Sequence, residues 1–418
     1  MMATGSGKTK AAMYAISQID TWKLLLICVP SLELVEQWEA DVRLFYPDTP
    51  IIKCGSPYRG HKELLKSLTQ ARFPEQVVVI STYDSAQGDY YMAKWKLAKT
   101  EQFAMICDEV HNMGAPKSQC LMELNPAYRI GLSATPRRNF DEIGSEKILD
   151  FYHQNTFEFS IKDAQREHYL VEYQYRILPC AMPEDDWELY KTFSREIVQL
   201  QHTLEQEDNE KEQLRLRQRI EGRYRDRAKL LKKNDQKAQT LQTIFDEIPP
   251  TARVLIYGDD LHHLAEIGQA LDHMGKYYFK YTGELDAQKE RPTILKEFRQ
   301  GIRKILLAVG CLDEGIDIPA CDVAVFISSS TSERQFIQRR GRVLRVAPGK
   351  TSAWIYDYLV YPILSARTND DERRLALSMI DAQYRRINLM VEDAINGIQE
   401  RQKLDQFLSQ RRLNPYDF

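Results

Sequence analysis

Short apolar segments alternate with amphipathic ones along the first part of this chain, and this alternation limits the folds that it can adopt. The apolar segments are rich in Leu, Ile and Val and lie at residues 23–29, 76–81, 103–107 and 128–133. Segments with a helical spacing of apolar residues, such as 32–45 and 61–71, lie between them. Strands that alternate with helices form a mostly parallel sheet covered on both faces. The pattern therefore predicts an α/β domain.

The same alternation returns in the second half of the chain. The candidate strands there are residues 253–257, 278–281, 304–309, 322–327 and 352–358. A chain of 418 residues is too long for one ordinary core. We therefore expect two α/β domains, each of which binds its ligands at the carboxyl ends of its strands.

The segment between the two α/β stretches follows a different pattern. Apolar residues recur at helical spacing through residues 187–204 and again through 216–231, and a polar run separates the two. This predicts a helical hairpin. The second arm is rich in Arg and Lys between residues 215 and 237. Such a run indicates either a solvated face or a surface that contacts nucleic acid.

These patterns divide the chain into four parts. The expected parts are a first α/β lobe at 1–165, a helical insert at 183–247, a second α/β lobe at 250–360 and a helical tail at 361–418. In the tail, apolar residues recur at heptad-like spacing from Ile380 to Ile398. This apolar face packs either on the second lobe or on a partner protein.

Composition excludes several classes of protein. The formal net charge of −3 gives no overall attraction to nucleic acid, so any such contact must be made by a local groove. The longest aliphatic run, residues 24–29, is too short to span a membrane, and the N-terminus lacks the apolar core of a signal peptide. We expect a cytoplasmic protein that does not bind membranes. The seven cysteines include no Cys-x-x-Cys pair, which favours reduced thiols over a zinc or iron–sulfur site.

Residues 3–9, Ala-Thr-Gly-Ser-Gly-Lys-Thr, form a candidate phosphate-binding loop. In such a loop a Gly-rich turn points backbone N–H groups at phosphate oxygens, and the following helix adds its positive N-terminal dipole. Lys8 reaches the β- and γ-phosphates, and the Thr9 hydroxyl ligates Mg²⁺. The expected nucleotide-binding residues are Thr4, Gly5, Ser6, Gly7, Lys8 and Thr9. The alternative is a surface turn before a helix, because Met2 replaces the first Gly of the general pattern.

A loop of this kind normally follows a buried parallel strand, and nothing ahead of Met1 in this sequence could form one. Three explanations stay open here. The chain starts further upstream, it is a fragment, or something else fills the position of that strand.

Two acidic residues follow the strand expected at 103–107. We assign Asp108 to Mg²⁺, because an acid at the end of such a strand lies beside the phosphate loop. Glu109 is placed to orient and deprotonate the attacking water. The alternative is a capped loop with two solvated acids. Ser133-Ala134-Thr135-Pro136 follows another strand and either links the nucleotide to a nucleic-acid site or is a turn with a helix cap.

A dense arginine segment, Gln338-Arg339-Arg340-Gly341-Arg342-Val343-Leu344-Arg345, lies in the second α/β stretch. Arg342 and Arg345 are three residues apart and therefore share one helical face. Facing a γ-phosphate, they would neutralise charge in the transition state. The alternative is a surface patch or a contact to phosphate backbones.

In chain order, these motifs resemble those of superfamily 2 helicases. The quoted phosphate loop is followed by Asp-Glu-Val-His, then Ser-Ala-Thr-Pro, then Gln-Arg-Arg-Gly-Arg-Val-Leu-Arg. Segments at 29–31, 37–38, 81–86, 281–285 and 312–319 make the chain similar to the branch around XPB-type DNA helicases. The resemblance spans about residues 1 to 360. It implies two RecA-like lobes that close on ATP while nucleic acid lies across both.

The resemblance also implies roles for residues of the second lobe. Gln338 joins Arg342 and Arg345 in sensing the γ-phosphate, while Gly315 and Asp317 couple the nucleotide to this lobe. Val309 stands where relatives commonly carry Thr, which puts one backbone contact in doubt. The adenine-reading segment and the N-terminal DNA-recognition domain of relatives are absent from this sequence.

Nucleic-acid contacts follow from the same resemblance. The residues implied near the nucleic-acid backbone are Ser31, Thr82 and Thr282, whose short hydroxyl side chains suit sequence-independent phosphate contacts. The helical insert takes the place of the thumb-like insertion of XPB relatives. We expect its basic residues Arg225, Arg227 and Lys229 to contact DNA.

The main expectation is an ATP-dependent, Mg²⁺-using DNA helicase or translocase. DNA is preferred to RNA through the family branch alone. A protein partner would bind through the helical tail or the N-terminal side. One alternative is the motor subunit of a restriction or defence complex that moves duplex DNA without separating strands. Another is a catalytically weak, truncated remnant that binds nucleic acid.

Overall fold

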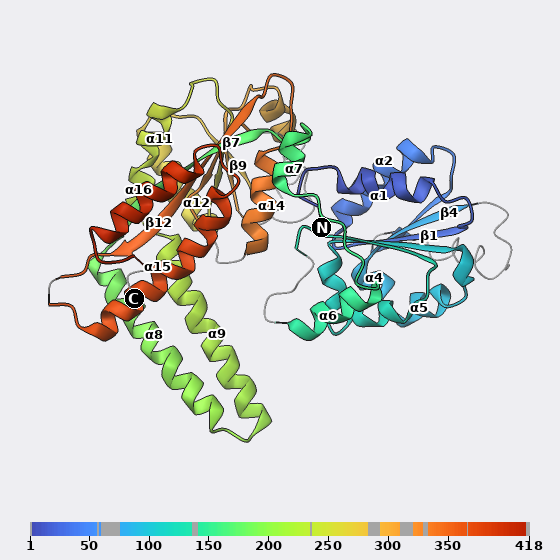
Figure 1. Ribbon diagram of the computed structural model, residues 1–418, viewed down its shortest axis with the longest axis horizontal. Helices are drawn as coiled ribbons and strands as arrows, with labels where there is room; N and C mark the ends of the chain where they lie inside the picture. Colours follow the sequence, from blue (N-terminus) through green and yellow to red (C-terminus); the bar gives the residue numbers. More distant parts are fainter. Residues whose placement is uncertain are drawn as a thin grey trace. The chain divides into compact units, whose positions relative to one another are not determined.

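The computed structural model describes residues 2–56, 58–59, 76–135, 141–234, 236–282, 293–309, 321–328, 333–365 and 367–414. The helix expected at 61–71 lies outside these ranges, as do Pro136 and the segment 312–319 with Gly315 and Asp317. The described residues form two compact units, drawn in Figure 1, one up to Leu170 and one from Val171 onward.

The first unit is built on a six-stranded sheet of order β3-β2-β4-β1-β5-β6. The strands are β1 (Leu24–Val29), β2 (Ile51–Gly55), β3 (Tyr58–Arg59), β4 (Val77–Thr82), β5 (Phe103–Asp108) and β6 (Tyr128–Leu132). All neighbours are parallel except the β2–β3 pair. The four strands expected from apolar runs are confirmed, and β2 and β3 are additional.

Helices cover both faces of this sheet (Figure 1). One face carries α1 (Lys8–Ser17) and α2 (Leu32–Phe45). The other carries α4 (Tyr83–Ala86), α5 (Asp89–Trp95), the 3-10 turns η2 (Val110–Gly114) and η3 (Ser118–Glu123), and α6 (Glu142–Phe151). Alternate strand residues such as Leu25 and Leu26 enter the two separate cores. The described residues of this unit also form two short helices, η1 (Thr100–Gln102) and α7 (Ile161–Arg166).

The second unit contains another six-stranded sheet, of order β7-β12-β11-β8-β10-β9, with every pair parallel. The strands are β7 (Glu172–Met182), β8 (Val254–Tyr257), β9 (Phe279–Tyr281), β10 (Ile305–Ala308), β11 (Val323–Phe326) and β12 (Ser352–Pro362). Helix α11 (Leu241–Glu247) precedes β8, α12 (Leu261–His273) follows β8, and α14 (Glu333–Val343) follows β11. β7 is a strand that the sequence patterns did not predict.

The helical hairpin predicted from the sequence consists of α8 (Glu184–Glu205) and α9 (Glu210–Lys232). It leaves the second unit from β7 and returns through α10 (Gln236–Gln239) and α11 to β8, so it is an insertion within this unit. Its base is held at the carboxyl end of β8 by ion pairs. Lys232 contacts Asp259 at 2.7 Å and Lys233 contacts Asp260 at 2.5 Å.

A buried lysine also ties the hairpin to the sheet. Lys237 Nζ of α10 donates to Leu231 O at 2.6 Å, where α9 ends, and to Ile327 O at 2.9 Å, just beyond β11. Burial lowers the pKa of Lys237 to about 7. A third carbonyl oxygen, Lys232 O, also accepts from Lys237 Nζ, at 3.3 Å. Together the three carbonyls satisfy the donors of the Lys237 amino group.

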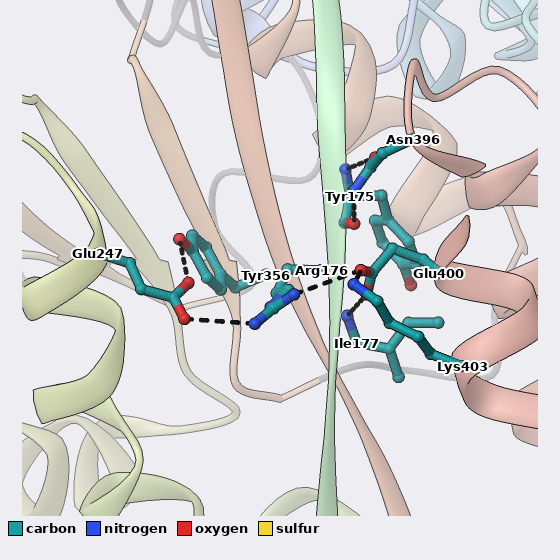
Figure 2. A network of polar contacts seen from close by, with 8 residues as sticks. All are labelled: Tyr175, Arg176, Ile177, Glu247, Tyr356, Asn396, Glu400 and Lys403. Carbon is teal, nitrogen blue, oxygen red and sulfur yellow. Dashed lines mark hydrogen bonds and ion pairs between the residues drawn. The ribbon is translucent and has the colours of Figure 1, made fainter. Parts of the chain in front are cut away.

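The tail forms α15 (Asp370–Val391) and α16 (Gly397–Ser409), which pack on β12 and β7. Figure 2 shows that its side chains bond to the outer edge of β7. Asn396 exchanges two 2.9 Å hydrogen bonds with the backbone of Tyr175, and Glu400 accepts from Ile177 N at 3.3 Å. The predicted apolar face is buried at Tyr384 but not at Ile398, which is 74% exposed.

Two further properties bear on the expectations from composition. The six cysteines among the described residues are free thiols, and all but Cys120 are buried. Within the described ranges, no helix combines the length and the apolar character needed to cross a membrane.

Candidate nucleotide site and nucleic-acid surface

The loop before α1 has the backbone geometry of a phosphate-binding loop. Gly5 and Gly7 have φ angles of 86° and 89°, which residues with a side chain rarely adopt. Ser6 closes the turn, because its N and Oγ both donate to Ala3 O, at 3.2 and 2.7 Å. Gly7 is the N-cap of α1 and gives no side-chain cap. The first N–H groups of α1 are therefore directed at a position that suits an anion.

Two side chains of this loop carry buried polar atoms with no hydrogen-bond partner in the described part of the chain. These atoms are Lys8 Nζ and Thr4 Oγ1. A buried ammonium without a counter-charge is costly, so the position of Lys8 fits a phosphate that supplies the missing charge. Thr9, the predicted Mg²⁺ ligand, is the second residue of α1 and is half-buried.

Asp108 ends β5, and hydrogen bonds from three groups fix its position. Trp38 Nε1 of α2 donates to Asp108 Oδ2 at 2.9 Å, and the backbone N–H of Glu109 donates to Oδ1 at 2.9 Å. Tyr83 OH donates to the main-chain oxygen of Asp108 at 2.8 Å. Each carboxylate oxygen keeps a free lone pair, so this group fits Mg²⁺, which prefers oxygen ligands.

Sequence reasoning missed the roles of Trp38 and Tyr83. Both lie in segments that carried the resemblance, at 37–38 and 81–86, but nothing in the spacing tied either residue to Asp108. Their contacts cross from α2 and α4 to β5 and are visible only in the folded unit.

Glu109 has a strained backbone. Its φ and ψ are 45° and 55°, in the left-handed region that is uncommon for a residue with a side chain and that recurs at functional sites. Its Oε2 lies 3.4 Å from Nδ1 of His111, which is 2% exposed. This geometry places a half-buried carboxylate next to Asp108, where it can act on a water molecule.

Polar residues line the carboxyl edge of the first sheet in the order of its strands. Thr82 ends β4, Ser31 follows β1, Asp108 ends β5 and Ser133 follows β6, and these strands are neighbours. Ser31 Oγ is buried and has no partner in the described part of the chain. Thr82 Oγ1 instead caps α4 by accepting from Ser85 N at 3.3 Å. Ser31 is therefore the hydroxyl better placed to bind a ligand.

The predicted phosphate-sensing residues of the second unit share one face of α14 and its continuation. Gln338 and Arg342 are buried, and Arg345 is half-buried two residues after the helix. Arginine normally stays charged because its pKa is high. Burial lowers the pKa of Arg345. Thr282, which follows β9, is 3% exposed.

The other two arginines of this motif have structural partners. Arg339 Nη1 donates to Ser328 O at 3.2 Å, and Arg340 Nη1 donates to Leu389 O at 2.8 Å. Arg340 also pairs with Asp393 at 3.1 Å. These contacts tie α14 to the end of β11 and to the tail.

The structure separates the three basic residues predicted to contact DNA. The guanidinium of Arg227 lies 5.2 and 5.1 Å from the ring centroids of Tyr190 and Tyr224 and donates to Ser194 Oγ at 3.2 Å. It therefore joins the two arms of the hairpin. Arg225 and Lys229 are exposed. With 3.6 residues per turn, they share a face of α9 with the exposed residues Lys211 and Arg215, and we call these four residues the basic stripe.

Two family models match parts of this chain. Residues 1–138 match the family model described as type III restriction enzyme, res subunit, and residues 236–347 match the helicase conserved C-terminal domain. The DNA 3′-5′ translocase XPB2 of Sulfurisphaera tokodaii is 23% identical over 365 residues, which cover 82% of this chain and 74% of that protein. A Haloarcula marismortui protein assigned as the DNA 3′-5′ helicase Rad25 is 27% identical over 349 residues. That match covers 82% of this chain but 47% of the relative, so the chain spans about half of its length.

A solved structure has the same fold. The helicase domain of Pyrococcus furiosus Hef aligns with a TM-score of 0.52 and 17% sequence identity, over 86% of this chain and 91% of that domain. The alignment shows the α/β architecture that the strand pattern predicted.

Proposed function

Because the chain belongs to the superfamily 2 helicases and is similar to their XPB-like branch, we propose that it is an ATP-driven motor that moves 3′-to-5′ along DNA and separates its strands. The direction and the choice of DNA follow the names of the relatives. The observation that carries the proposal is the buried, unpartnered Nζ of Lys8 at the N-terminus of α1.

In this proposal the first unit binds the triphosphate and activates water. Lys8 and the N–H groups of α1 hold the β- and γ-phosphates, with Thr9 and Asp108 as the protein ligands of Mg²⁺. Bound Mg²⁺ offsets the charge of the phosphates. Glu109 accepts the proton of the attacking water, while Trp38 keeps Asp108 in place.

The second unit contributes charge. We assign Arg342 and Arg345 to neutralising the γ-phosphate oxygens as the bond to the leaving group breaks, and Gln338 to sensing the same phosphate. Gly315 and Asp317 keep the coupling role that the resemblance implies. The cycle would close the lobes on ATP and reopen them after hydrolysis.

DNA contacts in this proposal are made to the phosphate backbone, without sequence preference. The Ser31 hydroxyl is buried and unpartnered in the described part of the chain, which supports a ligand at this edge. Thr82 and Thr282 would assist through backbone groups. The basic stripe of α9 gives the insert at 183–247 a surface that matches a line of phosphates.

The test is strand displacement on duplexes that carry either a 3′ or a 5′ single-stranded tail. The proposal predicts ATP-dependent release from the 3′-tailed duplex alone, and no release by Glu109→Gln. Release from the 5′-tailed duplex, or release that does not need ATP, would contradict it.

A second candidate function is favoured by one observation. Residues 1–138 match a family model described by the res subunit of type III restriction enzymes. A motor of that class moves along duplex DNA without opening it, and a partner would supply cleavage. Displacement of a third strand from a triplex, with a forked duplex left paired, would select this alternative.

A further inference from the structure

Arg340 belongs to the arginine motif of α14, but it lies on the other side of the helix from the phosphate-sensing residues. Gln338 and Arg342 are four residues apart and share one face of α14. Arg340 is midway between them in the sequence, about 200° around the helix from Gln338 at 3.6 residues per turn. Its side chain is 6% exposed. The proposed function gives this buried cation no role.

The partners of Arg340 lie where α15 ends. Its Nη1 donates to Leu389 O at 2.8 Å and to Tyr173 OH at 3.2 Å, and pairs with Asp393 Oδ2 at 3.1 Å. Leu389 is in the last turn of α15, where carbonyl groups lack partners within the helix. This turn has no basic residue of its own, so the guanidinium also meets the negative end of the helix dipole. Arg340 therefore caps a helix of the tail.

Strand β7 holds this end of the tail in place. Tyr173 OH, which accepts from Arg340, donates to Met390 O at 2.5 Å. Ile395 N donates to Tyr173 O at 2.9 Å. Tyr173 is fully buried, and β7 pairs with β12 along its whole length. The acceptors of Arg340 are thus fixed to the sheet.

The end of α14 is bonded to the start of the same strand. Val171 N, just before β7, donates to Leu344 O, just beyond α14, at 2.9 Å. A single contact would leave the helix free to turn about its axis. Contacts at residues 340 and 344 together fix both its rotation and its position along the axis.

We propose that Arg340, Asp393 and Tyr173 form a clamp through which the tail sets the position of α14. The clamp positions Arg342 and Arg345 from the opposite side of the helix. This inference rests on the proposed function, in which these two arginines neutralise the γ-phosphate. Groups that stabilise a transition state must be held in place beforehand, and a displacement of about 1 Å can cost about 100-fold in rate. The tail thus acts on catalysis without touching the nucleotide.

The experiment removes both charges of the clamp, because removing one would leave the other buried and unpaired. The clamp variant is Arg340→Met with Asp393→Asn. The matched control is Arg386→Met with Asp357→Asn, which removes another buried ion pair of α15, at 3.0 Å. That pair joins α15 to β12.

Hydrogen exchange of the full chain without nucleotide measures the clamp directly. In the clamp variant we expect the amides of residues 338–344 to exchange about tenfold faster than in the wild type, because α14 opens more readily. The control should leave these amides within about twofold of the wild type. Equal exchange in the wild type and the clamp variant, or an equal increase in both variants, would overturn the proposal.

Steady-state ATP hydrolysis measures the consequence for catalysis. We expect the kcat of the clamp variant to fall about tenfold with the KM for ATP unchanged, because the contact of the arginines is made in the transition state. An equal fall of kcat in the control, or a kcat equal to that of the wild type, would overturn the proposal. Absence of hydrolysis by the wild type would contradict the proposed function instead, and hydrogen exchange would still decide the clamp.

Asp393→Asn alone keeps the proposal testable if the clamp variant does not fold. The Asp393 side chain is 19% exposed, and Asn retains an oxygen that accepts from Arg340. We expect exchange of residues 338–344 to rise about threefold, because the contact loses its charge but not its hydrogen bond. Exchange equal to that of the wild type would again overturn the proposal.

Discussion

At the scale of single residues, the candidate phosphate loop contains a lysine whose amino group is buried without a hydrogen-bond partner among the described residues. Lys8 Nζ lacks a partner within the described residues, and so the free protein bears a cost that bound phosphate would relieve. Asp108 is the opposite case, since Trp38 and the Glu109 amide already bond to both of its oxygens.

Lys8→Met should separate the cost of burying the Lys8 charge from the contribution of Lys8 to ATP binding. Because the change removes a buried charge, we expect the melting temperature without nucleotide to stay equal or rise. The stabilisation given by ATP should disappear, and turnover should fall by about 100-fold or more. Thermal unfolding with and without ATP checks both expectations. Lys10→Met, at an exposed position of the same helix, should still show the rise in melting temperature that ATP gives. If Lys8→Met also showed this rise, the loop would not be part of the nucleotide site.

Trp38→Phe tests the positioning of Asp108. It keeps an aromatic ring in the core but removes the 2.9 Å hydrogen bond to Oδ2. We expect turnover to fall about tenfold and the Mg²⁺ requirement to rise, with a stability loss of about 1 kcal/mol. Trp22→Phe is the matched control, since Trp22 is equally buried in the same core and packs on Tyr46. If both variants lost turnover equally, Trp38 would have only a packing role.

At the scale of elements, apolar runs were sufficient to predict the buried central strands. β1, β4 and β5 are continuous apolar segments because helices cover both of their faces. β7 escaped prediction because its buried positions include Tyr173 and Tyr175 and alternate with polar residues. Its place in the sheet depends on pairing with β12, which is distant in the chain. The roles of Trp38 and Arg227 were hidden for the same reason, because their partners lie on other elements.

The hairpin gives a prediction that distinguishes its exposed cations from its structural one. Arg225→Ala with Lys229→Ala should weaken DNA binding and reduce the dependence of log K on log salt by about one to two units, because fewer counterions are released. Arg227→Ala should leave that slope unchanged but destabilise the hairpin, since it loses two ring contacts and the bond to Ser194. Binding titrations at several salt concentrations measure the slope, and an unchanged slope in the double variant would make the stripe a solvated face.

Helix α12 supplies a pH-dependent contribution to stability. Burial lowers the pKa of His263 to about 4, assisted by the charge of Lys237, and the Asp259 N–H donates to its neutral Nδ1 at 3.3 Å. Between pH 6.5 and 4 the unfolded chain binds a proton that the folded chain does not, so stability falls as pH falls through this window. At pH 5 the loss is about 2 kcal/mol.

Denaturant unfolding between pH 7 and 5 measures this effect. His263→Asn should flatten the profile by about that amount, because Asn can accept the same hydrogen bond without titrating. His262→Asn is the control, since the neighbouring His262 side chain is 77% exposed and pairs with Glu266. A profile unchanged by His263→Asn would mean that His263 takes up its proton at the same pH in the folded and the unfolded chain.

At the scale of the whole molecule, the first unit places its candidate site residues at the carboxyl ends of a mostly parallel sheet, and the second unit places most of its own on α14 and just beyond it. The tail covers the outer edge of β7, and a cavity of about 610 Å³ in the first unit lies beside β6, α1 and α6. The proposed function makes these units parts of one motor, in which ATP hydrolysis and DNA binding depend on each other. That coupling is the central claim.

The most direct test is ATP hydrolysis by the full chain without DNA, with single-stranded DNA and with duplex DNA. The proposed function predicts turnover that rises several-fold with DNA and is lost in Glu109→Gln, which should still bind ATP because Lys8 and the loop are intact. Hydrolysis that ignores DNA, or that survives Glu109→Gln, would contradict it.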